Sequence, residues 1–226
     1  MKKLNRLIPV LLLKNDLVYK TIKFKNPKYI GDPINTVKIF NDKGADEIII
    51  LDTLVSRNKK EPNYDLLKNI LSECFMPVCY GGGISNLDIS KKIFDLGVEK
   101  ISIKTALFNN NYKNIINDIA KIYGSQAIVS CIDIKKNLFG KYFIISNDLK
   151  IKYKLNIINF INSLIDNGVG EILLQFVDND GVMNGQDLNF IRYISESISV
   201  PLISLGGIGS NDNIKMSINY GADAVA

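Results

Sequence analysis

Short apolar runs alternate with amphipathic stretches along almost the whole chain. An apolar run that leads through a polar loop into a helix is the repeating unit of a parallel sheet. The pattern predicts strands over residues 7–13, 47–51, 77–80, 100–103, 127–132, 171–177, 201–205 and 222–226. It predicts helices over residues 33–43, 64–74, 87–96, 112–123, 157–167 and 211–220, with one more between residues 181 and 201. Strands and helices that alternate in this way indicate an α/β fold.

The two halves of the chain repeat each other. Like residues recur 124 positions apart in the pairs Glu47 and Glu171, Gly82 and Gly206, Gly83 and Gly207, and Gly97 and Gly221. A fixed spacing indicates an internal repeat, and alternating strands and helices suit a closed barrel. We therefore expect a single (βα)8 TIM barrel over residues 1–226, built from two duplicated half-barrels. Because the sequence ends soon after the eighth strand begins, we expect it to be truncated there, with helix eight missing.

Three segments lie outside this simple alternation. Residues 14–33 are too long for a tight barrel loop, and their VYKTIKF stretch predicts a small hairpin. This hairpin would be a mobile flap over the barrel mouth, although a plain surface excursion fits the same pattern. Residues 141–153 predict a second hairpin, and residues 56–63 (SRNKKEPN) predict a charged loop.

Composition narrows the possible chemistry. The chain has no histidine, which excludes His-based catalytic triads and His-ligated metal sites. Its three cysteines lack metal-site spacing, so no metal or cofactor is expected and the thiols are expected to be reduced, as in the cytoplasm. The net charge of +5 suits an anionic substrate, whereas scattered lysines argue against nucleic acid. No apolar run is long enough for a membrane span, and the apolar start lacks the cleavage site of a secretory signal.

Polar residues follow the predicted strands, at the end where a barrel keeps its active site. They are Asp52, Gly81 to Gly83, Lys104, Thr105, Asp133, Asp178, Asp180, Gly181, Gly206 and Gly207. Backbone N–H groups in glycine turns at helix N-termini bind phosphate, so the two glycine turns indicate a long substrate with two phosphates. Asp133 could act between them as a general acid or base, and capping of a helix N-terminus is its alternative role.

A second polar set precedes the strands, at the opposite end, which is the barrel bottom. It consists of Arg6, Glu47, Lys100 and Glu171, whose charges alternate in sign. On a barrel these side chains would form a ring at the bottom face. One interpretation is a salt-bridged plug that stabilises the fold, and the other is a gate into the barrel.

Several stretches together resemble the cyclase subunit of imidazole glycerol phosphate synthase. They are RLIPVLLLK, GDP, GADEIIILD, PVCYGGGIS, GVEKISIKTA, YGSQAIVSCIDIKK, GVGEILLQFVDNDG, NGQDL and VPLISLGGIGS. The resemblance implies a lyase-type synthase subunit that pairs with a glutaminase subunit docking on the barrel bottom. It implies that the ring Arg6, Glu47, Lys100 and Glu171 is an ammonia gate. It also implies a partner interface that includes Asp46, Glu99 and Gln126.

The chain departs from this family at the mouth. The resemblance implies two catalytic aspartates, and Asp133 matches one of them. Leu12 stands in place of the other and cannot exchange a proton. Lys104 stands where the family has asparagine at a phosphate site, and Leu205 stands where it has serine. A kept ammonia inlet beside altered cyclase chemistry resembles the cyclase-like paralogues that are linked to surface-glycan synthesis.

We therefore expect a subunit that accepts ammonia from a glutaminase and delivers it for the amidation of a sugar. The expected ligand at the mouth is a phosphorylated or acidic sugar-like molecule. Two alternatives stay open. One is a genuine cyclase of histidine biosynthesis, which would rely on Asp133 or on another acid such as Asp180. The other is a non-catalytic scaffold that activates the glutaminase.

Overall fold

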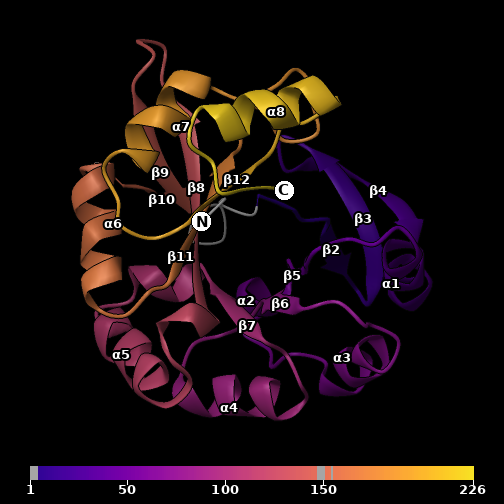
Figure 1. Cartoon of the computed structure of the whole chain (residues 1–226). Helices are drawn as coiled ribbons and strands as arrows, with labels where there is room; N and C mark the ends of the chain where they lie inside the picture. Colours follow the sequence, from indigo (N-terminus) through magenta and orange to yellow (C-terminus); the bar gives the residue numbers. More distant parts are fainter. Residues whose placement is uncertain (1–4, 147–150, 154) are drawn as a thin grey trace.

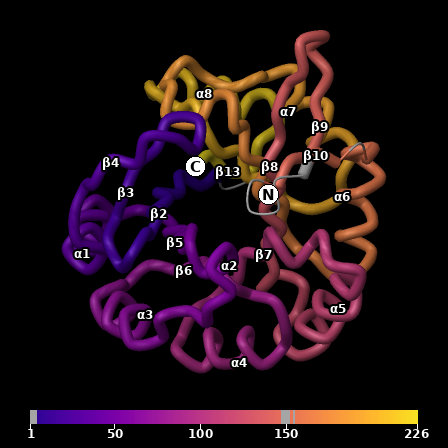
Figure 2. The backbone as a smooth tube through the Cα atoms, turned by 180° about the vertical axis from the view of Figure 1, so that it is seen from behind, coloured from indigo at the N-terminus to yellow at the C-terminus, as the bar shows by residue number. Residues whose placement is uncertain are grey.

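The computed structural model describes residues 5–146, 151–153 and 155–226. Parallel strands ring one axis, and the long helices lie outside them (Figures 1 and 2). The ring strands are β1 (Arg6–Leu7), β2 (Val10–Lys14), β5 (Ile48–Asp52), β6 (Val78–Gly81), β7 (Lys100–Ile103), β8 (Ile128–Lys136), β11 (Glu171–Phe176), β12 (Leu202–Leu205) and β13 (Ala224–Val225). Their order is β1, β13, β12, β11, β8, β7, β6, β5 and β2. Because β1 leads directly into β2, this α/β sheet closes on itself, which is consistent with a TIM barrel.

A proline divides the first barrel strand. Pro9 has no N–H to donate to a sheet, so the regular ladder stops between β1 and β2. Hydrogen bonds continue on both sides of the break. The Ile8 N–H donates to Val225 O at 2.9 Å, and the Ile49 N–H donates to Pro9 O at 3.0 Å. The single strand predicted over residues 7–13 is therefore split, with β1 paired to β13 and β2 paired to β5.

Amphipathic helices form the outer layer. They are α1 (Pro33–Asp42), α3 (Tyr64–Leu71), α4 (Leu87–Asp95), α5 (Tyr112–Tyr123), α6 (Ile157–Asp166), α7 (Leu188–Ser195) and α8 (Asn211–Asn219). All except α5 begin at an Asp, Asn or Ser whose side chain accepts a hydrogen bond from a first-turn N–H. The shorter helical pieces are α2 (Val55–Asn58), η1 (Thr105–Phe108) and η2 (Ser125–Ala127). The prediction of a plain loop over residues 56–63 is therefore wrong where α2 forms.

The two halves match element by element. The helices α1, α3 and α4 and the strand β6 recur 124 positions later as α6, α7, α8 and β12, with the same lengths. Side-chain detail recurs as well. The Val78 N–H donates to Glu99 Oε2 at 2.7 Å, and the Leu202 N–H donates to Asp223 Oδ2 at 2.9 Å. In each half, a carboxylate that precedes the next strand thus satisfies the first N–H of β6 or β12.

Side chains of the ring strands point alternately into the barrel and out towards the helices. The outward set forms the main core with the helices. The inward set forms a smaller core of Ile8, Ile49, Cys79, Val129, Cys131, Leu173, Ile203, Leu205 and Ala224. The interior between the two ends of the barrel is therefore apolar, and side chains fill it.

Two hairpins extend the sheet. The first joins β3 (Leu17–Ile22) to β4 (Lys25–Gly31), and the second joins β9 (Tyr142–Ser146) to β10 (Ile151–Tyr153). Both predicted hairpins are confirmed, with residues 147–150 lying outside the described residues. β9 also pairs with β8, and this pair projects beyond the helices in both views (Figures 1 and 2). Within the described ranges, no helix combines the length and the apolar character that crossing a membrane requires.

Candidate functional site

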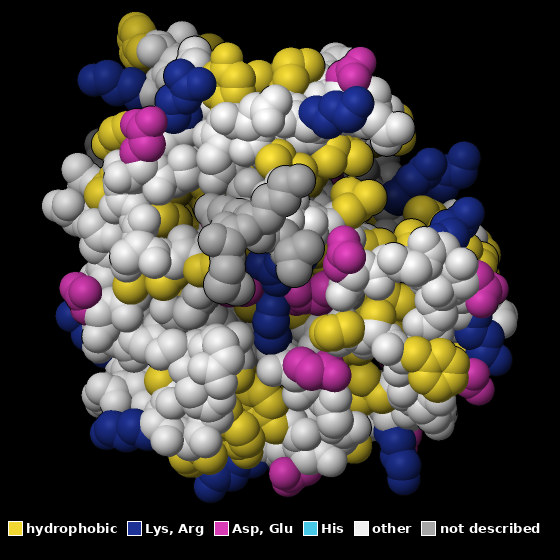
Figure 3. Space-filling view, in the orientation of Figure 1, with side chains coloured by type: hydrophobic (Ala, Val, Ile, Leu, Met, Phe, Trp, Pro, Cys, Tyr) yellow, Lys and Arg dark blue, Asp and Glu magenta, His cyan; other side chains and the backbone are white. Residues whose placement is uncertain are grey.

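Four charged side chains close the barrel bottom. Arg6 Nη1 lies 2.6 Å from Glu47 Oε2, and Arg6 Nη2 lies 3.0 Å from Glu171 Oε1. Lys100 Nζ lies 3.0 Å from Glu47 Oε2 and 3.2 Å from Glu171 Oε2. Each cation bridges both carboxylates, so the structure joins the four residues in one continuous ring. Basic and acidic side chains meet at the centre of this face in Figure 3.

The ring is largely removed from water. The side chains of Glu47 and Glu171 are 4% and 10% exposed, and those of Lys100 and Arg6 are 17% and 23% exposed. Burial alone would lower the pKa of Arg6, but Glu171 and Glu47 beside it raise that pKa above its ordinary value. Removing any member would leave a buried charge without its full compensation, which is costly in a protein interior.

Above the ring the interior becomes neutral. Burial raises the pKa of the Cys79 thiol well above its ordinary value, and the nearby Glu47 adds to the rise. This thiol therefore stays uncharged at neutral pH. Ser102, two residues after Lys100 on β7, is 4% exposed, and its hydroxyl has no hydrogen-bond partner in the described part of the chain. A buried hydroxyl with unused bonding capacity suits a small polar guest.

The residues expected at a partner interface lie at the same end. Asp46 and Glu99 accept hydrogen bonds from backbone N–H groups in β1 and β6, at 3.0 Å and 2.7 Å. Gln126 is exposed, and its side-chain amide donates to Tyr123 O at 2.9 Å. Each of the three therefore also braces the local backbone, which the sequence pattern did not reveal.

Asp133 lies inside the barrel at the mouth. It is 1% exposed and belongs to β8, which continues past it to Lys136. The alternative role as a helix N-cap is wrong, because Asp133 is paired within the sheet with Ile145 of β9. Lys104 Nζ lies 3.4 Å from Asp133 Oδ2. Two predicted mouth residues thus form an ion pair.

Two further side chains belong to the inner face of the barrel. Gln175 is the register partner of Asp133 on β11 and is 4% exposed. Sequence reasoning missed this carboxamide, although its spacing from Glu171 placed both on one strand face. Leu12, on β2, is the register partner of Leu51. By the alternation of β2, Leu12 shares the inner face, so an apolar side chain fills the place where the resemblance implies a second acid.

The glycine turn after β6 is held by the helix that sequence analysis missed. The Gly83 N–H donates to Ser56 Oγ at 3.1 Å, so this N–H is already bonded within the chain. Gly83 has φ +71°, and a Cβ added there would collide with Val55 Cγ1. Packing of α2 therefore requires glycine at this position, whether or not a phosphate binds.

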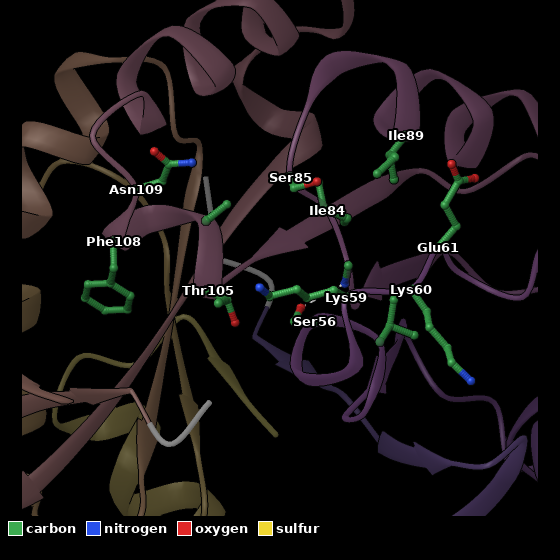
Figure 4. A pocket seen from close by; sticks show the side chains of 13 residues that line it. Ser56, Lys59, Lys60, Glu61, Ile84, Ser85, Ile89, Thr105, Phe108 and Asn109 are labelled. Carbon is green, nitrogen blue, oxygen red and sulfur yellow. Dashed lines mark hydrogen bonds between the residues drawn. The ribbon is translucent and has the colours of Figure 1, made fainter. Parts of the chain in front are cut away.

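A pocket of about 480 Å³ lies between the loops after β5, β6 and β7 (Figure 4). Gly83 and Thr105, two of the predicted phosphate-binding residues, line it together with Lys59. In Figure 4 the Lys59 side chain extends towards the side that carries Thr105. Lys104 is directed to Asp133 instead. The pocket therefore combines the predicted turn with a cation that sequence reasoning did not single out, and an anionic group suits it.

The second half contributes a matching set of glycines. Asp180 and Gly181 follow β11, and Gly206 and Gly207 follow β12. A Cβ added at Gly206 would lie 3.6 Å from the Asp180 nitrogen, and one at Gly207 would lie 2.9 Å from Asn179 Cβ. The structure thus brings these four predicted residues together at the mouth.

The β3–β4 hairpin lies across this set. Thr21 Oγ1 donates to Asp180 Oδ2 at 2.8 Å, and the Phe24 N–H donates to the same oxygen at 3.1 Å. The Phe24 ring centroid also lies 5.9 Å from Lys104 Nζ. The hairpin therefore reaches from Lys104 to Asp180 over the mouth, which is the position predicted for the flap. It also occupies one carboxylate oxygen of Asp180.

Asp178 has a different place from the one expected. Its Oδ2 accepts a hydrogen bond from the Lys136 N–H at 3.0 Å, and its Oδ1 lies 3.6 Å from Lys135 Nζ. Asp178 therefore holds the base of the β8–β9 hairpin. Nearby, Asp187 caps α7, pairs with Lys136 and accepts from Tyr142 Oη at 3.1 Å. Burial would raise the pKa of Asp187, but the Lys136 ammonium lowers it below its ordinary value.

Asp52 ends β5 at the mouth. Its Oδ1 accepts from the Leu54 N–H at 3.2 Å. Burial raises its pKa, and the negative charge of Asp16 raises it further.

As for metals, the described residues contain no cluster of three His, Cys, Asp or Glu side chains that could hold an ion.

Known proteins are similar to this chain over most of its length. The model of the family described as "Histidine biosynthesis protein" matches residues 6–226. A Pseudomonas aeruginosa protein with the provisional name imidazole glycerol phosphate synthase subunit hisF2 is 46% identical over 205 residues, which are 91% of this chain and 81% of that protein. A Vibrio vulnificus protein provisionally named subunit hisF3 is 46% identical over 212 residues, 93% of this chain and 80% of that one. A Leptospira borgpetersenii protein provisionally named subunit HisF is 42% identical over 212 residues, 93% and 82% of the two chains. On this evidence the chain belongs to the histidine biosynthesis protein family.

Proposed function

We propose that this chain is the ammonia-accepting and ammonia-channelling barrel subunit of a glutamine amidotransferase that serves sugar amidation in surface-glycan synthesis. One observation carries the proposal. The ring of Arg6, Glu47, Lys100 and Glu171 at the bottom is complete, whereas Leu12 at the mouth replaces a side chain that cyclisation would need. The four-residue ring proposed as the ammonia inlet is thus present, whereas Asp133 lacks the second acid that an acid–base pair would need.

The ring suits a gate because one side chain links both carboxylates. Lys100 Nζ contacts Glu47 and Glu171 within 3.2 Å, and a lysine side chain has several rotatable bonds. Swinging Lys100 aside would open the centre of the ring while Arg6 still bridged the two glutamates. A glutaminase subunit docked on the bottom face, over Asp46, Glu99 and Gln126, would supply the ammonia there.

The interior favours neutral ammonia over ammonium. Its inward side chains are apolar, and burial keeps the Cys79 thiol uncharged. Moving an ion into such surroundings is far more costly than moving a small neutral molecule. The Ser102 hydroxyl offers a hydrogen bond on the way from Lys100 to the mouth. Ammonia released at the ring would therefore travel as NH₃.

The ligand proposed at the mouth, which would accept the ammonia, is anionic. Gly83, Thr105 and Lys104 on one side would bind one end of a phosphorylated or acidic sugar-like molecule. On the other side the candidates are Asp180, Gly181, Gly206 and Gly207. Asp133 would act as the acid or base, with its charge balanced by Lys104 at 3.4 Å. These roles suit a ligand that brings negative charge to both sides of the mouth.

A genuine cyclase of histidine biosynthesis is the second candidate. The names of the relatives favour it, since they are provisionally called imidazole glycerol phosphate synthase subunits. A cyclase would have to manage with Asp133 alone, or with another acid such as Asp180. Because general acid–base catalysis is worth about 10²–10⁴-fold, the absence of one acid leaves a measurable difference.

The deciding experiment supplies ammonium salt directly, so that no glutaminase is needed. The full-length chain is incubated with ammonium and the ribulose-linked imidazole precursor of histidine synthesis. No turnover by the folded chain is expected, together with a glutaminase-dependent ammonia transfer that Lys100→Arg lowers because it keeps the ring shut. Turnover of the precursor would establish the cyclase instead. A chain whose activities are all unchanged by Asp133→Asn, while Lys100→Met alters its stimulation of the glutaminase, would be a scaffold.

A further inference from the structure

We infer that the mouth face is a docking surface for the enzyme that consumes the ammonia, a protein with an acidic face and an apolar pocket. This inference rests on the proposed function, because it concerns where the conducted ammonia goes. Its evidence is separate from the ring and comes from two hairpins at the mouth, here called the first (β3–β4) and the second (β8–β9), which lie apart in Figure 2.

The two hairpins have an unusual charge distribution. Residues 17–31 contain four lysines and residues 134–146 contain three, and neither stretch contains an aspartate or a glutamate. The whole chain, in contrast, has 23 acidic residues against 28 basic ones. Lys135 and Lys136 are paired with Asp178 and Asp187, so the basic character rests mainly on the other five. A partner that covers both hairpins should therefore present acidic side chains.

The loop after β11 ties the hairpins into one surface. Asp180 accepts hydrogen bonds from Thr21 and Phe24 in the first hairpin, and Asp178 accepts one from Lys136 at the base of the second. The carboxylates of this loop are thus turned towards the hairpins. Met183, in the same loop, is 64% exposed. This loop therefore contacts both hairpins through its carboxylates and presents an apolar side chain to solvent.

The turn between β8 and β9, which is the tip of the β8–β9 hairpin, presents two large apolar side chains fully to solvent. Leu138 and Phe139 are 102% and 89% exposed. The turn beneath them is braced by Asn137, whose Oδ1 accepts from the Phe139 and Lys141 N–H groups at 2.9 Å each. Single exposed apolar residues are ordinary, but two adjacent ones on a fixed turn are not. A preorganised aromatic anchor of this kind fits a pocket on a partner with little ordering cost.

The first hairpin adds exposed apolar side chains on its outer side. Ile22, Tyr29 and Ile30 are each more than half exposed. Because they are this exposed, they bury little apolar surface within the chain, although the Tyr29 ring contacts the Tyr19 ring edge to face. Together with Leu138 and Phe139, they provide two separate apolar contact sites for a partner around the mouth.

The chemistry of ammonia favours one occupant. Ammonia that leaves the barrel into water becomes ammonium, which has no lone pair for attack on a carbon. A barrel that conducts NH₃ therefore gains from an enzyme that seals its outlet and holds the electrophile. A second copy of this chain would present the same lysines and repel itself, and a membrane would not use the ammonia.

The test is photo-crosslinking in the cells that make this protein. A benzoylphenylalanine replaces Leu138 in the full-length chain, and the captured protein is identified, purified and assayed for ammonia consumption. The expected capture is an ammonia-consuming enzyme with an acidic face, whose affinity falls about tenfold or more with Phe139→Ser. Ile39→Ser, an equally polar change at a half-exposed site on α1, should leave that affinity unchanged.

The other outcomes overturn the inference. They are capture of no protein, of a second copy of this chain, of the glutaminase alone, or of an enzyme indifferent to Phe139→Ser. Flotation of the chain with phosphatidylglycerol vesicles in a Phe139-dependent manner would identify a membrane surface instead. The proposed function fails separately, if Lys100→Arg leaves glutaminase-dependent ammonia transfer intact while the crosslink still forms.

Discussion

Lys104 Nζ lies 3.4 Å from Asp133 Oδ2 at the barrel mouth, and the Asp133 side chain is fully buried. The acid that the family resemblance makes catalytic thus faces the cation that follows the neighbouring strand β7. A positive charge beside a buried carboxylate compensates part of the cost of burying it. Lys104 stands where the family resemblance implies asparagine. The ion pair therefore places a residue that differs from the family beside the expected catalytic acid.

Loss of this pair should be measurable as stability. Lys104→Met leaves the buried Asp133 with less compensation, and we expect the free energy of unfolding to fall by about 1–3 kcal/mol. The lower part of that range applies because the Lys104 side chain is 32% exposed. Urea unfolding at neutral pH measures the change. Lys92→Met, at the exposed pair with Glu61, is the matched control and should cost about 0.5 kcal/mol or less.

The double variant isolates the pair. Lys104→Met combined with Asp133→Asn removes both charges and should recover part of the loss seen with Lys104→Met alone. Strictly additive losses in the two single variants would mean that the two side chains do not interact.

The bottom ring should respond more strongly than the mouth pair. Lys100→Met leaves Glu47 and Glu171 sharing only Arg6, with both carboxylates at most 10% exposed. We expect a loss of about 3 kcal/mol in the free energy of unfolding, measured by urea titration. The conservative Lys100→Arg should keep most of the stability, because it keeps the charge.

Lys100→Arg also separates a gate from a plug. A guanidinium that stays bridged to both glutamates should hold the ring shut, so glutaminase-dependent ammonia transfer should fall although stability is kept. A mere plug predicts that transfer is unaffected by any change at this position. The readout is the yield of aminated product per glutamine hydrolysed.

The order of strands and helices could be predicted because period and capping are local properties. The predicted α5 and β7 match the structure residue for residue, since Gly124 ends the helix and Lys100 opens an apolar run. The break at Pro9 was not predicted. Pro9 interrupts the ladder locally, but the partner that β1 takes is β13, a strand far along the chain.

The site could be predicted only in part, because the contacts of its side chains depend on residues that are far apart in the sequence. Lys100 and Glu171 stand at the starts of predicted strands, so their place at the barrel bottom could be predicted. The bond from Gly83 to Ser56 could not be foreseen, because it requires α2 to form in a segment of loop-like composition. Asp178 and Asp180 looked equivalent in sequence, but each is bound to a different hairpin.

Asp52 provides a pH-dependent prediction. Burial and Asp16 raise its pKa above 3.8, so the folded chain holds this proton more tightly than the unfolded chain. The resulting stability is present below the unfolded-state pKa and is lost as the pH rises through the folded-state pKa. Asp52→Asn, which stays neutral and can still accept from the Leu54 N–H, should therefore gain stability relative to the native chain as the pH rises.

Thermal unfolding at about pH 3 and pH 7 measures this gain. Asp118→Asn, an exposed position on α5, is the control and should track the native chain at both values. An Asp52→Asn difference that is the same at both pH values would contradict the assignment.

The two carboxylates of the β11 loop should protect different amides. Asp180→Ala removes the acceptor for the Phe24 N–H and for Thr21, so amide exchange at Phe24 should accelerate about tenfold or more. Asp178→Ala should accelerate exchange at Lys136 instead and leave Phe24 protected. Hydrogen exchange followed by NMR reads both amides in one experiment. Equal acceleration of both amides by either change would mean that the hairpins open as one unit.

The glycine turn after β6 can be tested for packing without any ligand. Gly83 and Gly44 both have positive φ, at +71° and +66°, so alanine costs about 1–2 kcal/mol of backbone strain at each. At Gly83 the added Cβ would also collide with Val55, whereas at Gly44 nothing lies within 4 Å. Overpacking adds about 1–3 kcal/mol, so Gly83→Ala should lower the free energy of unfolding clearly more than Gly44→Ala. Equal losses in urea unfolding would mean that α2 yields to the new methyl group. In that case glycine at this turn would be explained by a ligand approaching its backbone and not by the packing of Val55.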